Sequence, residues 1–392
     1  MTTPAPGSWH WLDRDGLQAL IDALRAAGHR VIGPRVADAA IVLRDLDSVT
    51  DLPTGWLDEQ DGGSYRLRHD PDAGTFDHVV GPHSLKKFLF PPRETIASFT
   101  RSADGWHQAP PPASDPPLAV IGVRGCDLAA LAIQDRVFLA SGYVDAAYKA
   151  RRERLLLVAV NCRRAAATCF CHSTGCGPAA GPGFDLALTE VDGRFACEVG
   201  SARGADVLAR AAAAVAMTSA EVDAARTVPR ELEARMHGRT AADDGPRPRS
   251  LDTHGIRDLL MGNLEHPRWD DVASRCLSCT NCTLVCPTCF CASVQEVADL
   301  SGDHVDRDRH WASCFSLDHS RMHGHAVRST TASRYRQWLT HKFAGWIDQF
   351  GTSGCTGCGR CITWCPVGID VTEEIAAIRE TDGARAAPEP PR

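Results

Sequence analysis

Eight of the 17 cysteines in this sequence fall into two identical runs with the spacing C-x2-C-x2-C-x3-C-P. The first run comprises Cys276, Cys279, Cys282 and Cys286, and the second comprises Cys355, Cys358, Cys361 and Cys365. Each of the four irons of a cubane needs one soft thiolate, and this spacing lets a short loop reach three of them. The two runs therefore predict two [4Fe–4S] clusters.

The fourth cysteine of each run is expected to bind the neighbouring cluster, as it does in other two-cluster proteins. Zinc is the alternative metal for four-cysteine sites, in a structural scaffold. Zinc sites usually show paired C-x2-C knuckles, however, and not runs that end in C-P. We therefore assign Cys276, Cys279, Cys282 and Cys365 to cluster 1, and Cys355, Cys358, Cys361 and Cys286 to cluster 2.

A second group of cysteines follows two apolar segments earlier in the chain. Cys126 comes after Leu118–Val123 and Cys162 comes after Leu155–Val160, which is the pattern of two buried parallel strands. Parallel strands end at the same edge of a sheet, where ligand loops gather. Alternatively, these cysteines are small buried hydrophobic residues, and Cys176 is a spare candidate ligand nearby. We favour a third [4Fe–4S] cluster bound by Cys126, Cys162, Cys169 and Cys171.

Three more cysteines, Cys289, Cys291 and Cys314, are left over by these assignments. They could ligate an additional centre together with a non-cysteine residue such as His310 or Asp318. They could also simply line the cavity of a neighbouring cluster. Three thiols alone do not decide between these interpretations.

The elements around the N-terminal cysteines predict an α/β domain. Asp15–Ala27 has the apolar spacing of a helix, and Leu128–Phe138 is a helical stretch between the two buried strands. This strand–helix–strand order indicates a parallel βαβ unit. Phe184–Val199 has the pattern of a β-hairpin with Cys197 in the core. Arg203–Met236 is largely helical, and its proline is expected to break or kink the helix.

Two proline-rich stretches, Ala109–Pro117 and Asp243–Arg249, divide the chain. After the second, the pattern is one of helices, such as Ile256–Leu264 and Arg334–Phe350, joined by cysteine loops with few strand signals. We therefore predict an α/β domain with the third site over residues 1–240, an α-helical ferredoxin-like domain with two [4Fe–4S] clusters over 250–382, and a disordered tail over 383–392.

Composition and charge exclude several partners. A formal net charge of -7 and the lack of a Lys/Arg block argue against nucleic acid. No stretch approaches the roughly 20 apolar residues that span a bilayer, and the N-terminus shows no signal-peptide pattern. We expect a cytoplasmic protein without a membrane span, in a compartment where disulfides are disfavoured.

Nucleotide-binding signals are scarce. Gly122–Gly125 follows a strand but lacks the G-x-G-x-x-G pattern, and there is no P-loop. A basic and aromatic loop, Gly81–Arg93, could contact a flavin, a partner or a cluster edge, although we interpret it as a packed surface loop. The sequence therefore carries neither of these nucleotide-binding motifs.

Several stretches resemble the beta subunit of cytoplasmic NAD(P)-linked sulfhydrogenases, the group 3b [NiFe] hydrogenases. The resemblance runs from about His78 to Ile378. The same domain is similar to the A subunit of anaerobic sulfite reductase. The resemblance is carried by GPHSLKKFLFPPRE, GVRGCDLAALAIQDRVFL, VAVNC with TCFC, CPTCFC, WASC and GCTGCGRCITWCPVGIDV.

The resemblance implies an electron-transfer subunit with no catalytic residue of its own. Its expected partners are the small and large [NiFe] hydrogenase subunits and a subunit that binds FAD and NAD(P). The eight cysteines of the two runs match the family's ferredoxin motifs. Cys126, Cys162, Cys169 and Cys171 match recurring positions, whereas Cys176 does not. The alternative is an electron-transfer subunit of an anaerobic sulfite reductase.

Overall fold

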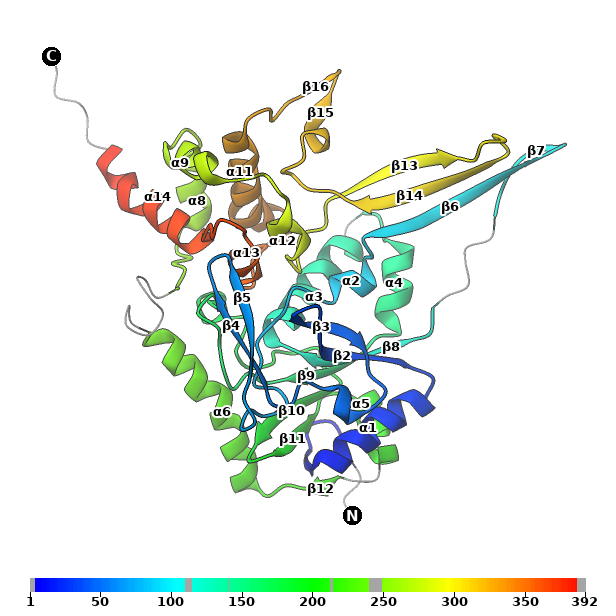
Figure 1. Cartoon of the computed structure of the whole chain (residues 1–392), viewed down its shortest axis with the longest axis vertical. Coiled ribbons are helices and arrows are strands. Elements are labelled where there is room, and N and C mark those ends of the chain that lie inside the picture. Colours follow the sequence, from blue (N-terminus) through cyan, green and yellow to red (C-terminus); the bar gives the residue numbers. More distant parts are fainter. Residues whose placement is uncertain (1–3, 110–114, 141, 212–213, 240–248, 386–392) are drawn as a thin grey trace.

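The computed structural model describes residues 4–109, 115–140, 142–211, 214–239 and 249–385. A large sheet with its helices forms the lower part of the view in Figure 1, and the cysteine-rich helices form the upper part. A long, narrow sheet projects to the right between them (Figure 1). The middle of each proline-rich stretch, residues 110–114 and 243–248, lies outside the described residues, as does most of the predicted tail.

The large sheet is mixed and has eight strands in the described part of the chain. Its four inner strands β10, β9, β8 and β2 run parallel to one another, and the outer pairs are antiparallel. The predicted parallel βαβ unit and the predicted hairpin are both present. In spatial order the strands are β12 (Val215–Ala216), β1 (Trp9–Leu12), β11 (Arg194–Val199), β10 (Leu186–Val191), β9 (Leu156–Val160), β8 (Leu118–Val123), β2 (Arg30–Ala37) and β3 (Ala40–Asp45).

Helices cover both faces of this sheet because its central strands are apolar on both sides. Ile121 of β8 and Val158 of β9 are opposite each other and belong to one buried cluster, together with α1 and α5. Val120 and Leu157 point to the other cluster, under α3 and α4. Cys197 is fully buried in the first cluster. The helices are α1 (Arg14–Ala26), α2 (Lys86–Leu89), α3 (Gly125–Phe138), α4 (Ala146–Glu153) and α5 (Ala202–Ala211).

The segment after the hairpin differs from the prediction. It is divided by β12 into α5 and a second helix, α6 (Ser219–His237). Pro229 does not end α6, because the helix continues for eight residues beyond it with the proline ring buried. A capping box between Thr218 and Glu221 fixes the start of α6.

The cysteine-rich part contains several helices around an aromatic core that includes Trp269, Tyr335 and Trp338. Its helix α14 extends three residues past the predicted start of the tail, and residues 386–392 are not described. The segments are α8 (Ile256–Gly262), α9 (Arg268–Arg275), α10 (Asn281–Leu284), α11 (Thr331–Thr340), the π-helical turn η4 (His341–Gly345), α12 (Trp346–Phe350), α13 (Arg360–Thr363) and α14 (Val371–Arg385).

Strands also occur in this part, which corrects the prediction of helices with few strand signals. The projecting sheet is antiparallel and joins segments about 200 residues apart in sequence, because β14 pairs with β6. Its polar strands have no buried apolar face, which is why the hydrophobic pattern missed them. The strands are β13 (Ala292–Ala298), β14 (His304–Trp311), β6 (Arg93–Ser102) and β7 (Gly105–Gln108), with a separate short pair β15 (Arg321–Met322) and β16 (His325–Ala326).

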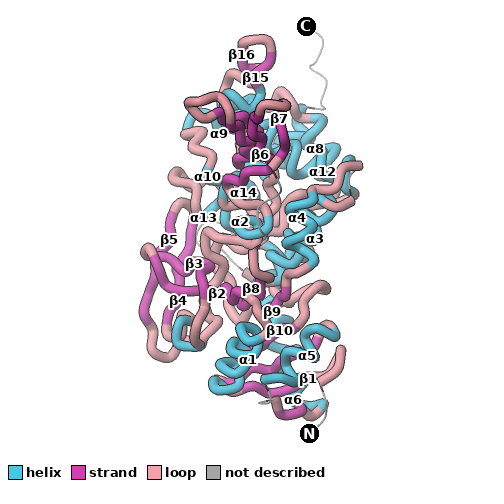
Figure 2. The backbone as a smooth tube through the Cα atoms, turned by 90° about the vertical axis from the view of Figure 1, so that its right-hand side faces the viewer, coloured by secondary structure: helices cyan, strands magenta, loops and turns pink. Residues whose placement is uncertain are grey.

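A two-stranded hairpin, β4 (Trp56–Asp61) and β5 (Ser64–His69), links the large sheet to the cysteine-rich part. Figure 2 shows this hairpin on one side of the molecule and α3 and α4 on the other. At its tip, Gly63 donates a backbone hydrogen bond to the carbonyl of Ile362 in α13. Short 3-10 turns complete the fold, namely η1 (Val49–Asp51), η2 (Cys171–Thr174) and η3 (Asp318–Ser320).

Candidate metal centres

All 17 cysteines lie within the described residues, and all are free thiols. Sixteen of them gather in four places, and Cys197, in the core under α1 and α5, is the exception. We name these places cavity A, cavity B, the sheet-edge group and cavity C. Each is defined below by its cysteines.

Cavity A is lined by the first three cysteines of the first run and the last of the second. The cysteines are Cys276, Cys279, Cys282 and Cys365, and Cys361 also reaches the cavity. The other walls are largely apolar and include Phe315, Tyr335 and Trp338. Backbone amides point at the sulfurs, since Ile369 N lies 3.3 Å from Cys365 Sγ and Ser278 N lies 3.5 Å from Cys276 Sγ. Such amides stabilise a charged sulfur.

Cavity B is lined by the complementary set: Cys286, Cys355, Cys358 and Cys361. Gly357 N lies 3.4 Å from Cys355 Sγ, which repeats the amide contact of cavity A. The structure therefore brings together each set of four cysteines that the crossed assignment requires, with Cys286 and Cys365 exchanged between the runs.

The two runs also share an unusual backbone conformation. Ser278 and Thr280 have left-handed φ angles of 50° and 72°, and the residues 79 positions later, Gly357 and Gly359, have 64° and 74°. The second run needs glycine there, because a Cβ on Gly357 would lie 2.6 Å from Cys171 Cα and one on Gly359 would lie 2.3 Å from the carbonyl oxygen of Thr168. The first run has room for side chains at the same turn. The shared spacing thus encodes a shared ligand loop.

Burial makes these thiols costly to ionise in the absence of a metal. It raises the pKa of Cys282 and Cys361 well above the usual range, and that of Cys355 to about 12. Cys286 is different. A hydrogen bond from the Cys289 thiol, together with the Lys342 ammonium, holds the pKa of Cys286 well below its usual range.

Lys342 places a buried ammonium group between cavity B and cavity C. Its Nζ lies 3.3 Å from Cys286 Sγ and 3.7 Å from Cys289 Sγ, and it also donates to Thr288 Oγ1 and to the carbonyl oxygen of Gly354. Burial alone would lower the pKa of Lys342, but the sulfurs of Cys286 and Cys289 hold it above its usual value. The sequence offered no signal for this role, because Lys342 lies in a helical pattern where lysine is normally exposed.

The sheet-edge group consists of Cys126, Cys162, Cys169 and Cys171, which belong to one buried cluster of side chains. Cys126 lies in the first turn of α3, directly after β8, and Cys162 follows β9. The cluster also includes Cys176, which the resemblance had set aside, and Cys358 of cavity B. Burial raises the pKa of Cys169 to about 12. The parallel strands therefore bring the four predicted cysteines together.

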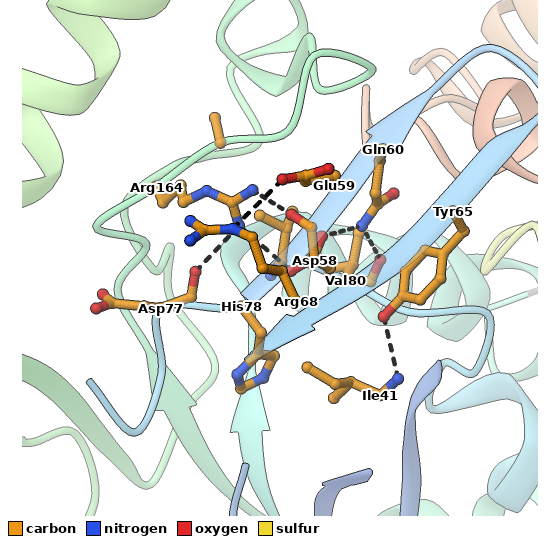
Figure 3. Close-up of polar contacts among 12 residues, drawn as sticks. Ile41, Asp58, Glu59, Gln60, Tyr65, Arg68, Asp77, His78, Val80 and Arg164 are labelled. Atoms are coloured by element: carbon orange, nitrogen blue, oxygen red, sulfur yellow. Dashed lines mark hydrogen bonds and ion pairs between the residues drawn. The ribbon is translucent and has the colours of Figure 1, made fainter. Parts of the chain in front are cut away.

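A buried polar network holds the loop that carries this group (Figure 3). Arg164 donates to the carboxylate of Asp58 and to the carbonyl oxygen of Asp77, at 3.4 Å in each case. Asp58 is fully buried and also accepts a 2.6 Å hydrogen bond from Gln60. Gln60 in turn accepts from Thr363 Oγ1 at 2.9 Å. The β4–β5 hairpin thereby ties the loop after Cys162 to the second cysteine run.

The sheet-edge group and cavity B are in direct contact. Phe170 N donates a 2.8 Å hydrogen bond to the carbonyl oxygen of Gly357. Arg360 forms an ion pair of 2.8 Å with Asp127, and the Arg360 side chain is only 1% exposed. Because Asp127 follows Cys126 and Arg360 precedes Cys361, this buried ion pair joins the loops of the two sites.

Cavity C is lined by the three remaining cysteines, Cys289, Cys291 and Cys314. His310 and Asp318, the partners considered from the sequence, are not among its lining residues, and His341 and Lys342 are. The loop Gly81–Arg93 is not simply a packed surface loop, because Lys86 within it is buried next to the sulfurs of Cys289 and Cys286.

Among the described residues, no three His, Cys, Asp or Glu side chains are arranged to hold a single metal ion. A cubane is larger than one ion, and each of its thiolates binds a different iron. Cavities A and B suit such a group, because each combines four thiols with a largely apolar lining and amides aimed at sulfur.

Comparison with known proteins agrees with this chemistry. Residues 275–369, which include both runs, match the family model of the 4Fe-4S dicluster domain. The chain is 29% identical over 302 residues to Sulfhydrogenase 2 subunit beta of Pyrococcus furiosus, covering 75% of this chain and 82% of that relative. No solved structure matches the chain significantly. In the described part of the chain, no helix is long and apolar enough to cross a membrane.

The domain match confirms the prediction of a 4Fe–4S dicluster domain in the C-terminal third. Together with the similarity to a sulfhydrogenase beta subunit, it supports an iron–sulfur protein with a role in electron transfer.

Proposed function

We propose that this chain is the electron-transfer subunit of a cytoplasmic, NAD(P)-linked [NiFe] hydrogenase. It relays electrons between a subunit that binds FAD and NAD(P) and the hydrogenase subunits. Three [4Fe–4S] clusters carry the electrons, at cavity A, cavity B and the sheet-edge group. The chain has no catalytic residue of its own in this proposal.

The observation that carries the proposal is the exchange of one cysteine between two cavities that adjoin each other. Cys286 lies at cavity B and Cys365 at cavity A, and Cys361 lines both. Crossed ligation of this kind keeps two clusters close, as electron hopping requires. The hydrogenase assignment is supported by the relative, which is named as a sulfhydrogenase subunit.

The protein contributes ligands, charge and shielding. Bound clusters accept and donate single electrons. The cysteines hold them, the backbone amides of Gly357 and Ile369 stabilise charge on sulfur, and Lys342 and Arg360 supply buried positive charge. The apolar walls of cavity A exclude water, which also affects the potential.

Anaerobic purification of the tagged chain with its native partners tests the proposal. Nickel and FAD in the complex, with H2-dependent reduction of NAD(P)+, are the expected result. A sirohaem absorption band without nickel would assign the chain to a sulfite reductase. Stoichiometric zinc with no iron would contradict an electron-transfer role altogether.

Variants then test the three cluster sites. Cys162→Ser should remove about four irons per chain while the signals of the other two clusters remain. Cys355→Ser should abolish electron transfer between NAD(P)H and hydrogenase without dissociating the complex. Cys197→Ser is the control, because Cys197 lies in the core under α1 and α5, away from the three proposed cluster sites. An unchanged iron content in Cys162→Ser would mean that the sheet-edge cysteines are structural.

A further inference from the structure

Cavity C resembles cavities A and B in its lining, yet none of the three proposed clusters occupies it. Lys342 lines both cavity C and cavity B. Three thiols line cavity C, and the rest of the wall includes Phe290, Trp338 and Trp346. Cavity C therefore offers thiols in largely apolar surroundings, as cavities A and B do.

The chain folds so that these three thiols converge. Cys289 and Cys291 follow the first run directly, and Cys314 comes just after β14. Ala312 N donates a 2.8 Å hydrogen bond to the carbonyl oxygen of Cys291, which fixes the two segments side by side at the base of the projecting sheet. Cys291 and Cys314, from these two segments, line the same cavity as Cys289.

The charges around cavity C favour an anionic occupant. Lys342 and Lys86 are 5% and 3% exposed, and both face the sulfurs of Cys286 and Cys289. In the described part of the chain neither ammonium forms an ion pair with a carboxylate, and Lys86 contacts only the carbonyl oxygen of Thr283 at 3.1 Å and the ring of Trp311. Lys342 has the Cys286 sulfur beside it, so two buried ammonium groups share the counter-charge of one sulfur, and an uncompensated buried charge is costly. Thiolates bound to a metal group would supply that counter-charge.

A fourth ligand is available. His341 lines the same cavity and precedes Lys342 in the π-helical turn η4. Inserted π-turns of this kind are frequent at functional sites, because the extra residue redirects side chains. Imidazole is a common ligand of iron.

We propose that cavity C holds an additional iron–sulfur centre, ligated by Cys289, Cys291, Cys314 and His341. Each of the three thiols loses its proton when iron binds. This inference rests on the proposed iron–sulfur role of the chain and extends it by one site. The centre adjoins cavity B, because Lys342 bridges Cys286 and Cys289, and it adjoins cavity A, because Trp338 lines both cavities.

Iron and labile sulfide counts on the anaerobically purified full chain test the site. Cys291→Ser and Cys314→Ser should each lose about four irons relative to the unmodified chain, whatever its total, as one [4Fe–4S] centre requires. Cys197→Ser should lose none. Equal iron in Cys291→Ser and the unmodified chain would overturn the additional centre and leave the proposed function intact. An unmodified chain without iron would instead refute the proposed function.

A second measurement covers the case in which the serine variants fail to fold. Pulsed EPR of the dithionite-reduced chain should show nitrogen hyperfine coupling from a directly bound imidazole. The coupling should disappear in His341→Cys, which offers a thiolate in place of the imidazole and should keep its iron. Absence of such coupling in the unmodified chain, or its persistence in His341→Cys, would overturn the ligand set. If the unmodified chain contains one equivalent of zinc and Cys314→Ser lacks it, the site binds zinc and the proposed iron–sulfur centre is overturned.

Discussion

Lys342 should raise the reduction potential of the cluster at cavity B, and its replacement by methionine should lower that potential substantially. The ammonium is fully buried and lies 3.3 Å from Cys286 Sγ. Reduction adds one negative charge to the cluster, and a nearby positive charge stabilises the reduced form. Methionine keeps much of the side-chain volume but removes the charge.

The size of the effect follows from the geometry. A sulfur contact of 3.3 Å puts the ammonium at about 6 Å from the centre of a bound cubane. Two unit charges at that separation interact by about 3 kcal/mol at an effective dielectric constant of about 20. This energy corresponds to about 120 mV for a one-electron couple, because 59 mV is equivalent to about 1.4 kcal/mol. The midpoint potential should therefore fall by about 120 mV in Lys342→Met.

EPR-monitored redox titration of the purified chain measures this shift. Lys342→Arg keeps the charge and should stay near the unmodified value, and Lys149→Met removes a lysine whose side chain is 54% exposed and should have no effect. Iron content must be equal in all variants, because Lys342 also donates to Thr288 and to the carbonyl of Gly354. A shift in Lys342→Met below about 30 mV, a quarter of the expected value, would refute the electrostatic reasoning.

Three more predictions concern how the sites are held in place. Asp127→Asn leaves the buried Arg360 guanidinium without its counter-ion and should lower the free energy of unfolding by about 3–5 kcal/mol, measured by anaerobic thermal unfolding. A loss below about 1 kcal/mol would contradict a structural role for this ion pair. Gly357→Ala should destabilise the fold by about 1–3 kcal/mol more than Gly351→Ala. Both glycines have left-handed φ angles, but only at Gly357 would a Cβ collide with backbone atoms. Equal losses of stability in the two variants would contradict this steric argument. Burial holds the pKa of His78 well below its usual value, so stability should be complete above the unfolded pKa of about 6.5 and fall by about 2 kcal/mol from pH 7 to pH 5. In His78→Gln this part of the pH dependence should vanish, and its persistence would assign it to other groups.

The sequence predicted the centre of the large sheet correctly, because its signals are local. β8 and β9 are continuous apolar runs, and the helix between them requires a parallel crossover. The hairpin of β10 and β11 follows from Asp192 and Gly193 at its turn, where both residues have positive φ angles. These features need no knowledge of distant partners.

The projecting sheet could not be predicted in the same way. Acidic and basic residues alternate along the middle of β14. Its central Asp308 is buried because Arg93 and Thr95 of β6 donate hydrogen bonds to its carboxylate. Those partners lie more than 200 residues earlier in the sequence. The pairing is thus set by long-range polar contacts, to which hydrophobic periodicity is blind.

The residues of the candidate sites likewise divide into those that local spacing predicted and those that depend on distant parts of the chain. The spacing of the cysteines specifies which thiols converge, and the structure places both crossed sets around their own cavities. The buried cations were missed, because the groups that surround Lys342 and Arg360 come from other parts of the chain. Whether each set binds a cluster stays a prediction that iron analysis will test.

Cavity B has a central position among the four groups. Cys358 lines cavity B and also packs in the sheet-edge group, Cys361 lines both cavity B and cavity A, and Lys342 bridges cavity B to cavity C. In the proposed arrangement of clusters, an electron that enters at the sheet-edge group reaches cavity A or cavity C by way of cavity B. The potential of a cluster at cavity B would then govern every route that starts or ends at the sheet-edge group. A single buried lysine at that point can adjust the energy of the step that these routes share.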